Sequence, residues 1–240
     1  MLEQKTVLVV VPARGGSVGI KLKNLREVAG LSLVAIAGRV VAQLGFVDRA
    51  VVSTDDDRIA AAAEAAGIGA PFRRPEDLSG NRIADWDVLH QALIEMEQQD
   101  ARRYDIVVML QPTSPLRTPE QVEACVKMLI EGEFDAVWSV SETDTKGHPL
   151  KQLLVQDSGE MSYYDPEGAK IIARQQLTPV YHRNGVAYAI TRECILDQKN
   201  IKGERCGAYV IEGPMANIDT EDDLERAELL AARLDLPWLK

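Results

Sequence analysis

A glycine-rich loop with three basic side chains follows the first apolar run of the sequence. The run ends at Val11, and residues 12–24 then read PARGGSVGIKLKN, with Arg14, Lys21 and Lys23 as the basic positions. Glycines allow backbone amides to approach an anion, and the basic side chains supply positive charge. The loop matches neither GxxxxGK[ST] nor GxGxxG. An anion-binding loop and a tight turn with solvent-facing lysines are therefore both consistent with this stretch.

Carboxylates occupy similar positions after other apolar runs. Residues 55–57 are all aspartate, and Asp55 is expected to cap the helix that follows, because a carboxylate accepts the free amides of a first turn. Asp219 precedes another predicted helix, where it or Thr220 could be the cap. Mg²⁺ needs only one or two hard oxygen ligands beside a substrate's phosphates, so a sparse carboxylate set would suffice. None of the three histidines has neighbouring metal-ligand partners, and no nucleophile–histidine arrangement supports covalent catalysis.

The elements that must position these loops alternate between strands and helices. Apolar runs predict strands at residues 6–11, 49–54, 105–112 and 135–142. Helical periodicity and end signals predict helices at residues 32–45, 56–67, 86–99, 118–132 and 220–235. Strands separated by such helices imply βαβ crossovers and a mainly parallel sheet covered on both faces. Ligands bind at the carboxyl ends of the strands in open sheets of this kind, which is where the loops described above would meet.

The pattern changes from about residue 146. The stretch shows short strand signals and turn residues without helical periodicity, and we interpret it as a β-rich excursion from the main sheet. The chain then returns through two apolar runs, NGVAYAIT and CGAYVIE. We therefore predict an α/β domain formed by residues 1–145 and 186–240, with residues 146–185 as a protruding segment.

Composition excludes several classes of function. The 240 residues carry a formal net charge of −10, which disfavours binding to a nucleic-acid backbone but leaves a small polyanion such as a nucleotide open. No run of about 18 apolar residues predicts a membrane span. We interpret the N-terminus as a first strand rather than a signal peptide. The three cysteines are scattered and match no zinc motif, which is typical of a cytoplasmic protein without disulfides.

Six segments, in order along nearly the whole chain, resemble the acylneuraminate cytidylyltransferases, also called CMP-sialic acid synthetases. They read VPARGGSVGIKLKNL, VSTDD, RRPEDLSG, LQPTSPLR, RQQLTPVYHRNGVAYAI and NIDTEDDL. The resemblance implies a Rossmann-like, mainly parallel sheet of the nucleotide-diphospho-sugar transferase type, with a small β-rich protruding segment that helps to form a homodimer. It also implies CMP transfer from CTP to an acidic nine-carbon 2-keto sugar, with pyrophosphate released and Mg²⁺ as cofactor.

The resemblance further implies roles for individual residues. Contact with the nucleotide falls to the glycine-rich loop and to one later arginine, namely Ala13, Gly15, Gly16, Ser17, Lys21, Asn24 and Arg74. Catalysis falls to side chains that would hold the triphosphate or the acceptor, namely Arg14, Lys23, Gln111 and Arg174. The acid sugar would face Gln111, Arg174 and Tyr188, and Asp219 with Asn217 would hold the metal. Without the resemblance, Arg74 and Arg174 would be interpreted as surface ion-pair residues of small energetic value.

This sequence departs from the family pattern at three positions. The family loop usually reads Gly-Ser-Lys-Gly, whereas Val18 stands here in place of the lysine. The family's Asp-Ile-Asp metal motif begins here with Asn217, and Lys21 stands where proline is common. Our hypothesis is that Lys21 reaches the phosphates in place of the missing lysine.

Three interpretations of function are open at this stage. The first is an active enzyme for sialic, legionaminic or pseudaminic acid. The second is an enzyme for another acidic acceptor such as 3-deoxy-manno-octulosonate. The third is a CTP-binding homologue with weak or lost catalysis, which the departures at Val18 and Asn217 motivate.

Overall fold

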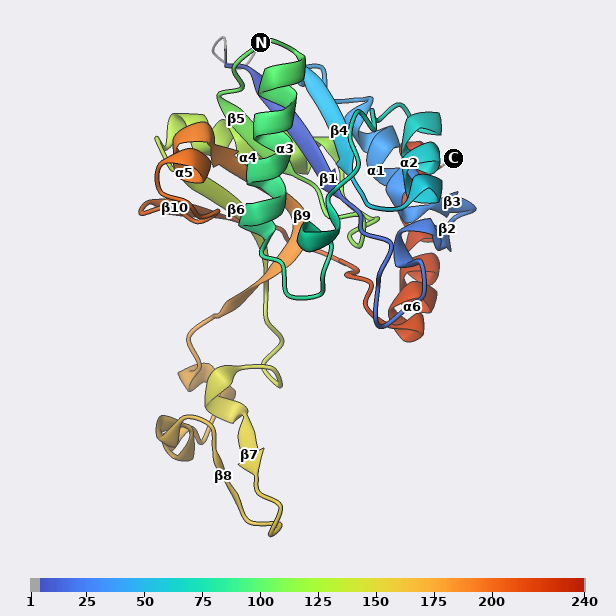
Figure 1. Cartoon of the computed structure of the whole chain (residues 1–240). Coiled ribbons are helices and arrows are strands. Elements are labelled where there is room, and N and C mark those ends of the chain that lie inside the picture. The colour runs from blue at the N-terminus through green and yellow to red at the C-terminus, as the bar shows by residue number, and fades with distance from the viewer. Residues whose placement is uncertain (1–4, 240) are drawn as a thin grey trace.

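A six-stranded sheet forms the centre of the protein. The computed structural model describes residues 5–239, and the strand order is β10-β6-β9-β5-β1-β4 (Figure 1). The strands are β1 (Val7–Pro12), β4 (Arg49–Ser53), β5 (Ile106–Met109), β6 (Ala136–Glu142), β9 (Tyr181–Thr191) and β10 (Cys206–Val210). β1 runs parallel to β4 and β5, and β10 runs parallel to β6, whereas β9 is antiparallel to both of its neighbours. The predicted α/β class with a mainly parallel sheet is confirmed.

Helices cover both faces of this sheet (Figure 1). The helices are α1 (Leu33–Val41), α2 (Asp57–Ala65), α3 (Asp85–Gln99), α4 (Pro119–Glu131), α5 (Arg192–Leu196) and α6 (Glu221–Ala231). Side chains of α1, α2, α4 and α6 share one buried cluster, and those of α3 and α5 share another. In β1, Val7, Val9 and Val11 belong to the first cluster, and Leu8 and Val10 belong to the second. The strand is continuously apolar because both of its faces are buried.

The helix starts follow capping chemistry. α4 begins at Pro119, and the Thr118 hydroxyl accepts a bond from the amide of Gln121, as the sequence indicates. At α2 the prediction is wrong by one residue, because Asp56 is the cap. Its carboxylate accepts bonds from the amides of Arg58 and Ile59, and the side-chain bond from Arg58 lowers the pKa of Asp56. This leaves Asp55 available for a contact in the site described below.

Shorter elements complete the fold. Strands β2 (Glu27–Val28) and β3 (Leu31–Ser32) form a small hairpin. The 3₁₀ turns are η1 (Lys23–Leu25), η2 (Glu76–Leu78), η3 (Pro149–Lys151), η4 (Pro166–Lys170), η5 (Arg174–Gln176) and η6 (Pro237–Leu239). Among the described residues, no helix has the length and apolar character needed to cross a membrane.

A long excursion, which we call the arm, leaves the sheet between β6 and β9. It comprises residues 143–180 and projects away from the body of the protein (Figure 1). Its hairpin consists of β7 (Leu153–Val155) and β8 (Met161–Tyr163), and the amide of Thr143 bonds to the carbonyl of Val180 where the arm begins. Residues 181–185 of the predicted protruding segment belong to β9.

Candidate active site

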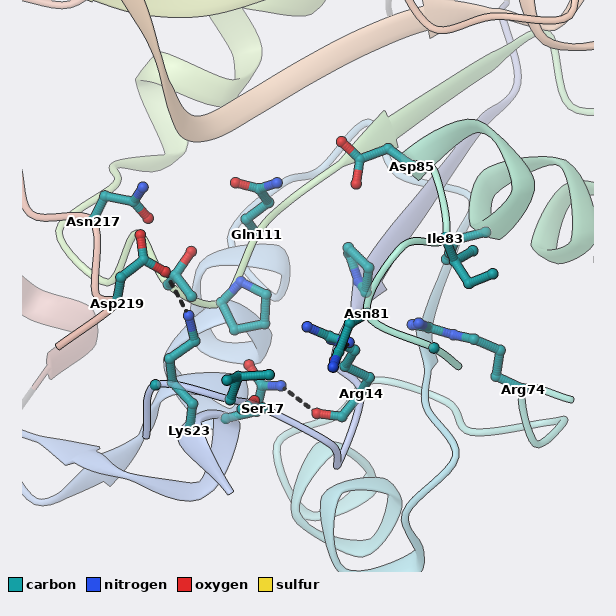
Figure 2. A pocket seen from close by; sticks show the side chains of 18 residues that line it. Arg14, Ser17, Lys23, Arg74, Asn81, Ile83, Asp85, Gln111, Asn217 and Asp219 are labelled. Carbon is teal, nitrogen blue, oxygen red and sulfur yellow. Dashed lines mark hydrogen bonds and ion pairs between the residues drawn. The ribbon is translucent and has the colours of Figure 1, made fainter. Parts of the chain in front are cut away.

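A cavity of about 580 Å³ opens at the carboxyl ends of β1 and β5. Its wall comes from the glycine-rich loop, the segment before α3, the segment after β5 and the segment before α6 (Figure 2). The lining residues are Pro12, Arg14, Ser17, Val18, Gly19, Lys23, Asn24, Arg74, Gly80, Asn81, Ile83, Asp85, Val88, Gln111, Pro112, Thr113, Asn217 and Asp219. Segments far apart in the sequence thus converge at the edge of the sheet where ligands bind in such folds.

Close backbone approach explains two glycines of the loop. A Cβ on Gly19 would lie 2.5 Å from the carbonyl oxygen of Asp219, and one on Gly15 would lie 2.9 Å from Cβ of Asp56. Neither position has room for a larger residue unless the neighbour shifts. The buried Asn24 donates from Nδ2 to the carbonyl oxygen of Arg14 at 3.0 Å and so ties the loop together. Val18 is 76% exposed at the rim of the cavity.

Lys23 and Arg14, two of the basic side chains predicted to bind phosphate, both line this cavity. Lys23 Nζ lies 2.8 Å from Asp219 Oδ1, and this pair joins the glycine-rich loop to the segment before α6 (Figure 2). Arg14 donates to the side-chain oxygen of Asn81. The Lys23 side chain is 16% exposed, whereas that of Asp219 is 71% exposed. The arrangement therefore provides concentrated positive charge for an anion, together with a solvent-accessible carboxylate beside it.

Ala13 and Gly15, two loop residues predicted to contact the nucleotide, have backbone amides that are already hydrogen-bonded. The amide of Ala13 donates to the carbonyl of Ser53 at 2.9 Å, and that of Gly15 donates to Asp55 Oδ1 at 2.8 Å. Any contact of these two residues with a nucleobase would therefore fall to their carbonyl groups. Gly16 is exposed and has open space around its Cβ position.

Arg74 is buried at the wall of the cavity. Its guanidinium donates to the hydroxyl of Ser53 at 2.9 Å and also to the carbonyl oxygen of Ser53. Burial lowers the pKa of Arg74 to about 10, and the charge of Asp55 works against this shift. The side chain thus stays protonated at neutral pH and is held rigidly, which suits recognition of a fixed polar edge.

Arg117 is a structural residue that the sequence prediction missed. It is fully buried, and its guanidinium donates to the carbonyl oxygens of Gln111, Ser114 and Gly185. Burial lowers its pKa to about 9. Gly185 has φ +74°, and a Cβ there would lie 2.5 Å from Oε1 of Gln111. These contacts fix the turn that carries Gln111 into the cavity. The arginine of the PTSPLR stretch was the available signal.

Six predicted site residues are absent from the cavity lining. Three are the loop residues Ala13, Gly15 and Gly16 described above, and the others are Tyr188, Arg174 and Lys21. Tyr188 is 1% exposed, and its hydroxyl accepts a bond from the amide of Gly185 at 3.0 Å, so it supports the Gln111 turn from behind rather than facing a ligand. Arg174 lies in η5 of the arm, exposed to solvent. Lys21 is exposed and absent from the wall formed by the loop. Within this one chain the structure does not bring these side chains together with the others.

Three polar residues of the wall were not anticipated, namely Asn81, Asp85 and Thr113. Asp85 is the first residue of α3, and burial raises the pKa of its carboxyl against the opposing charges of Arg183 and Arg74. Arg183 Nη1 lies 3.7 Å from Asp85 Oδ2. The available sequence signal was an aspartate directly before the predicted start of a helix.

The donor set for a cation is small. Among residues 5–239 no group of three or more histidine, cysteine or acidic side chains has metal-binding geometry. Asp219 and Asn217 both line the cavity and offer one carboxylate and one amide oxygen. Asp219 Oδ1 contacts Lys23, and the side chain is otherwise largely exposed. These oxygens fit Mg²⁺, which is commonly held by one or two carboxylates plus substrate phosphates.

The fold and this cavity define an α/β protein with a cationic ligand site at the strand ends. Residues 8–233 match the protein family described as cytidylyltransferase. The chain therefore belongs to the cytidylyltransferases, which are CTP-dependent nucleotidyltransferases.

Individual relatives extend over nearly the whole chain. A pseudaminic acid cytidylyltransferase of Campylobacter jejuni is 28% identical over 93% of this chain and 95% of its own length. A CMP-N,N'-diacetyllegionaminic acid synthase of Legionella pneumophila is 31% identical over 92% of this chain and 93% of its own length. A solved CMP:2-keto-3-deoxy-manno-octonic acid synthetase complexed with CTP has a TM-score of 0.68 at 20% identity, covering 95% of this chain and 99% of that chain. This last likeness supports the fold.

Proposed function

We propose that this protein transfers CMP from CTP to the anomeric hydroxyl of an acidic nine-carbon 2-keto sugar and releases pyrophosphate. Relatives named for pseudaminic and legionaminic acid align over more than nine-tenths of the chain and support this acceptor class. The observation that carries the proposal is a single cavity that contains Arg14 and Lys23 together with Gln111 and Asp219. Phosphate-binding cations and a polar acceptor-side group thus share one space.

The reaction is an in-line displacement at the α-phosphorus. The acceptor oxygen attacks, and the bond to the pyrophosphate leaving group breaks. Catalysis of this kind depends mainly on positioning and on neutralising charge that spreads over the phosphate oxygens. We propose that Lys23 and Arg14 supply that neutralisation, and their position in the lining of the cavity supports this role. Gln111, fixed by the turn that Arg117 holds, would orient the acceptor.

Mg²⁺ is the proposed cofactor, with Asp219 and Asn217 as its protein ligands. When bound, the ion would neutralise phosphate charge and orient the triphosphate. Asn217 contributes an oxygen without charge. The protein's share of the negative charge at this site therefore comes from Asp219, whose carboxylate Lys23 also contacts.

Pyrophosphate release from CTP and Mg²⁺ tests this function. The acceptor panel contains N-acetylneuraminate, legionaminic acid, pseudaminic acid and 3-deoxy-manno-octulosonate, with glucose 1-phosphate as the non-ketoacid control. We expect release with at least one nine-carbon acid. Turnover confined to the eight-carbon acid would favour the alternative acceptor. CTP binding without turnover on any acid would favour a binding-only homologue.

We also propose that the protein acts in the cytoplasm as a homodimer joined through the arm. The arm hairpin exposes Leu153, Leu154, Val155, Met161 and Tyr163. Leu153 pairs with Tyr163 and Val155 pairs with Met161 on one face of the hairpin, and Leu154 lies on the other face. An isolated two-stranded hairpin is marginal in water, and exposed apolar side chains grouped in this way are typical of a protein interface. The cysteines described are free thiols, which is consistent with a reducing compartment.

A further inference from the structure

Arg183 provides a cation at the edge of the cavity, next to the base of the arm. It lies on β9 opposite Val140, and its guanidinium carbon lies 5.1 Å from the centroid of the Trp138 ring. The ring is itself fixed, because Trp138 Nε1 donates to the carbonyl of Ile201 at 2.9 Å. On its other side, Arg183 Nη1 lies 3.7 Å from Oδ2 of Asp85, which lines the cavity. The guanidinium is thus held against an aromatic face beside the ligand space.

Other arginines near the cavity are committed to protein groups. Arg74 donates to Ser53, and Arg117 is buried and donates to backbone carbonyls. Arg183 differs from both, because within residues 5–239 its guanidinium has no hydrogen-bond acceptor apart from the ion-pair contact at 3.7 Å. Its side chain is 51% exposed. A half-exposed, positioned guanidinium with open donors is suited to bidentate binding of a planar carboxylate.

Different cations lie at the two ends of the cavity, so each end is suited to a different anion. Figure 2 shows Lys23 and Asp219 on one side of Gln111 and Asp85 on the other. Arg14 and Lys23, the proposed phosphate-binding cations, belong to the glycine-rich loop, whereas Arg183 lies beside Asp85. An anion bound on the Asp85 side of Gln111 would therefore lie nearer to Arg183 than to Lys23.

We propose that Arg183 binds the carboxylate of the acid-sugar acceptor within the same chain, with Trp138 and Asp85 as positioning residues. This inference rests on the proposed function and names a specificity residue for it. The guanidinium lies over the Trp138 ring and has no hydrogen-bond acceptor among the described residues apart from the contact with Asp85, so its remaining donors are available to the carboxylate of the acceptor. Arg174, which the resemblance assigns to the acceptor, lies on the arm instead.

A substrate–enzyme double cycle tests the proposal. The acceptor that gives the most pyrophosphate release is compared with its carboxamide, which keeps the size but loses the charge, on wild type, Arg183→Ala and Arg183→Lys. We expect Arg183→Ala to raise the KM for the acid about tenfold or more, with the KM for CTP changed less than about twofold. For the carboxamide, wild type and Arg183→Ala should be alike. The KM of Arg183→Lys for the acid should lie between those of wild type and Arg183→Ala, because lysine keeps the positive charge but lacks the planar guanidinium that binds a carboxylate through two hydrogen bonds.

Arg205→Ala is the matched control. Arg205 also stacks on an aromatic ring, with its guanidinium carbon 5.7 Å from the centroid of Phe134, but it precedes β10 at the opposite end of the sheet. It should leave both KM values unchanged. If Arg183→Ala raised the KM for the acid and for the carboxamide equally, or raised neither, the carboxylate role of Arg183 would be overturned and the proposed function would remain intact. A wild-type enzyme inactive with every acid of the panel would overturn both.

Discussion

At the scale of single residues, Lys23 and Lys21 occupy different environments although they are two positions apart. Lys23 faces the cavity and pairs with Asp219, whereas Lys21 is exposed on the outer side of the loop. The structure therefore places Lys23, but not Lys21, in the lining of the cavity. The hypothesis that Lys21 replaces the missing family lysine stays a prediction, because Lys21 is exposed and does not line the cavity in this structure.

We expect Lys23→Ala to weaken CTP binding about tenfold or more, since it removes a charge-assisted contact and leaves Asp219 unpaired beside the triphosphate. Isothermal titration with CTP and Mg²⁺ measures this effect. Lys127→Ala is the control, because Lys127 forms only an exposed pair with Glu123 on α4. Lys21→Ala measured in the same series decides the loop hypothesis: unchanged affinity would refute it.

Asp85 is predicted to destabilise the fold at neutral pH. Burial raises the pKa of its carboxyl, so the folded state favours the protonated form and is penalised when the group is ionised. Asp85→Asn should therefore raise the melting temperature near pH 8. The gain should shrink as the pH falls through the folded-state pKa, where wild type also becomes neutral. Thermal melts across pH test this, with Asp157→Asn in an exposed arm turn as control; a gain independent of pH would contradict the charge explanation.

At the scale of elements, the glycine-rich loop and the segment before α6 act as one unit. Gly19 packs against the backbone of Asp219, and Lys23 bonds its side chain. The position of the proposed metal ligand is therefore set by the loop that is proposed to hold the triphosphate. A change in either segment is expected to displace the other.

Gly19→Ala should lower kcat/KM for CTP by about tenfold or more, because the new methyl group would force the loop away from Asp219. Circular dichroism and the melting temperature should change little, since the contact lies at an exposed edge. Gly45→Ala is the control: its Cβ position has no atom within 4 Å, and it lies after α1, away from the cavity. Normal turnover in Gly19→Ala would show that the close approach is not needed for activity.

At the scale of the whole molecule, the arm differs from the body because its hairpin buries none of its own residues. Every residue of β7 and β8 is exposed. The body buries two apolar clusters, whereas the arm leaves its largest apolar side chains in solvent. The apolar surface therefore suits a second copy of the chain better than it suits water.

Charge introduced on the arm should prevent dimerisation. We expect Leu154→Lys combined with Met161→Lys to convert a dimer into a monomer in sedimentation-velocity experiments at micromolar concentration. The matched control is Leu229→Lys on α6, where the leucine is 62% exposed and lies on the body. A wild-type protein that sediments as a monomer at every concentration would reject the dimer.

Local signals in the sequence determined the strands, most helix ranges and the glycine-rich loop. Apolar runs, caps and turn glycines depend on neighbouring residues, and they can be recognised without the rest of the chain. The parallel-sheet pattern predicted that the loops after the strands lie at one edge of the sheet. That Arg14, Lys23, Asn24, Gln111 and Asp219 belong to one site was implied by the family resemblance, and all five line the cavity.

Only the tertiary structure decided which polar side chains are free to act. It assigned the α2 cap to Asp56, the burial of Tyr188 and Arg117 behind Gln111, and the place of Arg174 on the arm. It also brought Asp85 and Arg183 together from positions 98 residues apart in the sequence. The physical reason is that side-chain exposure and long-range pairing depend on how separate elements pack, which no local pattern specifies.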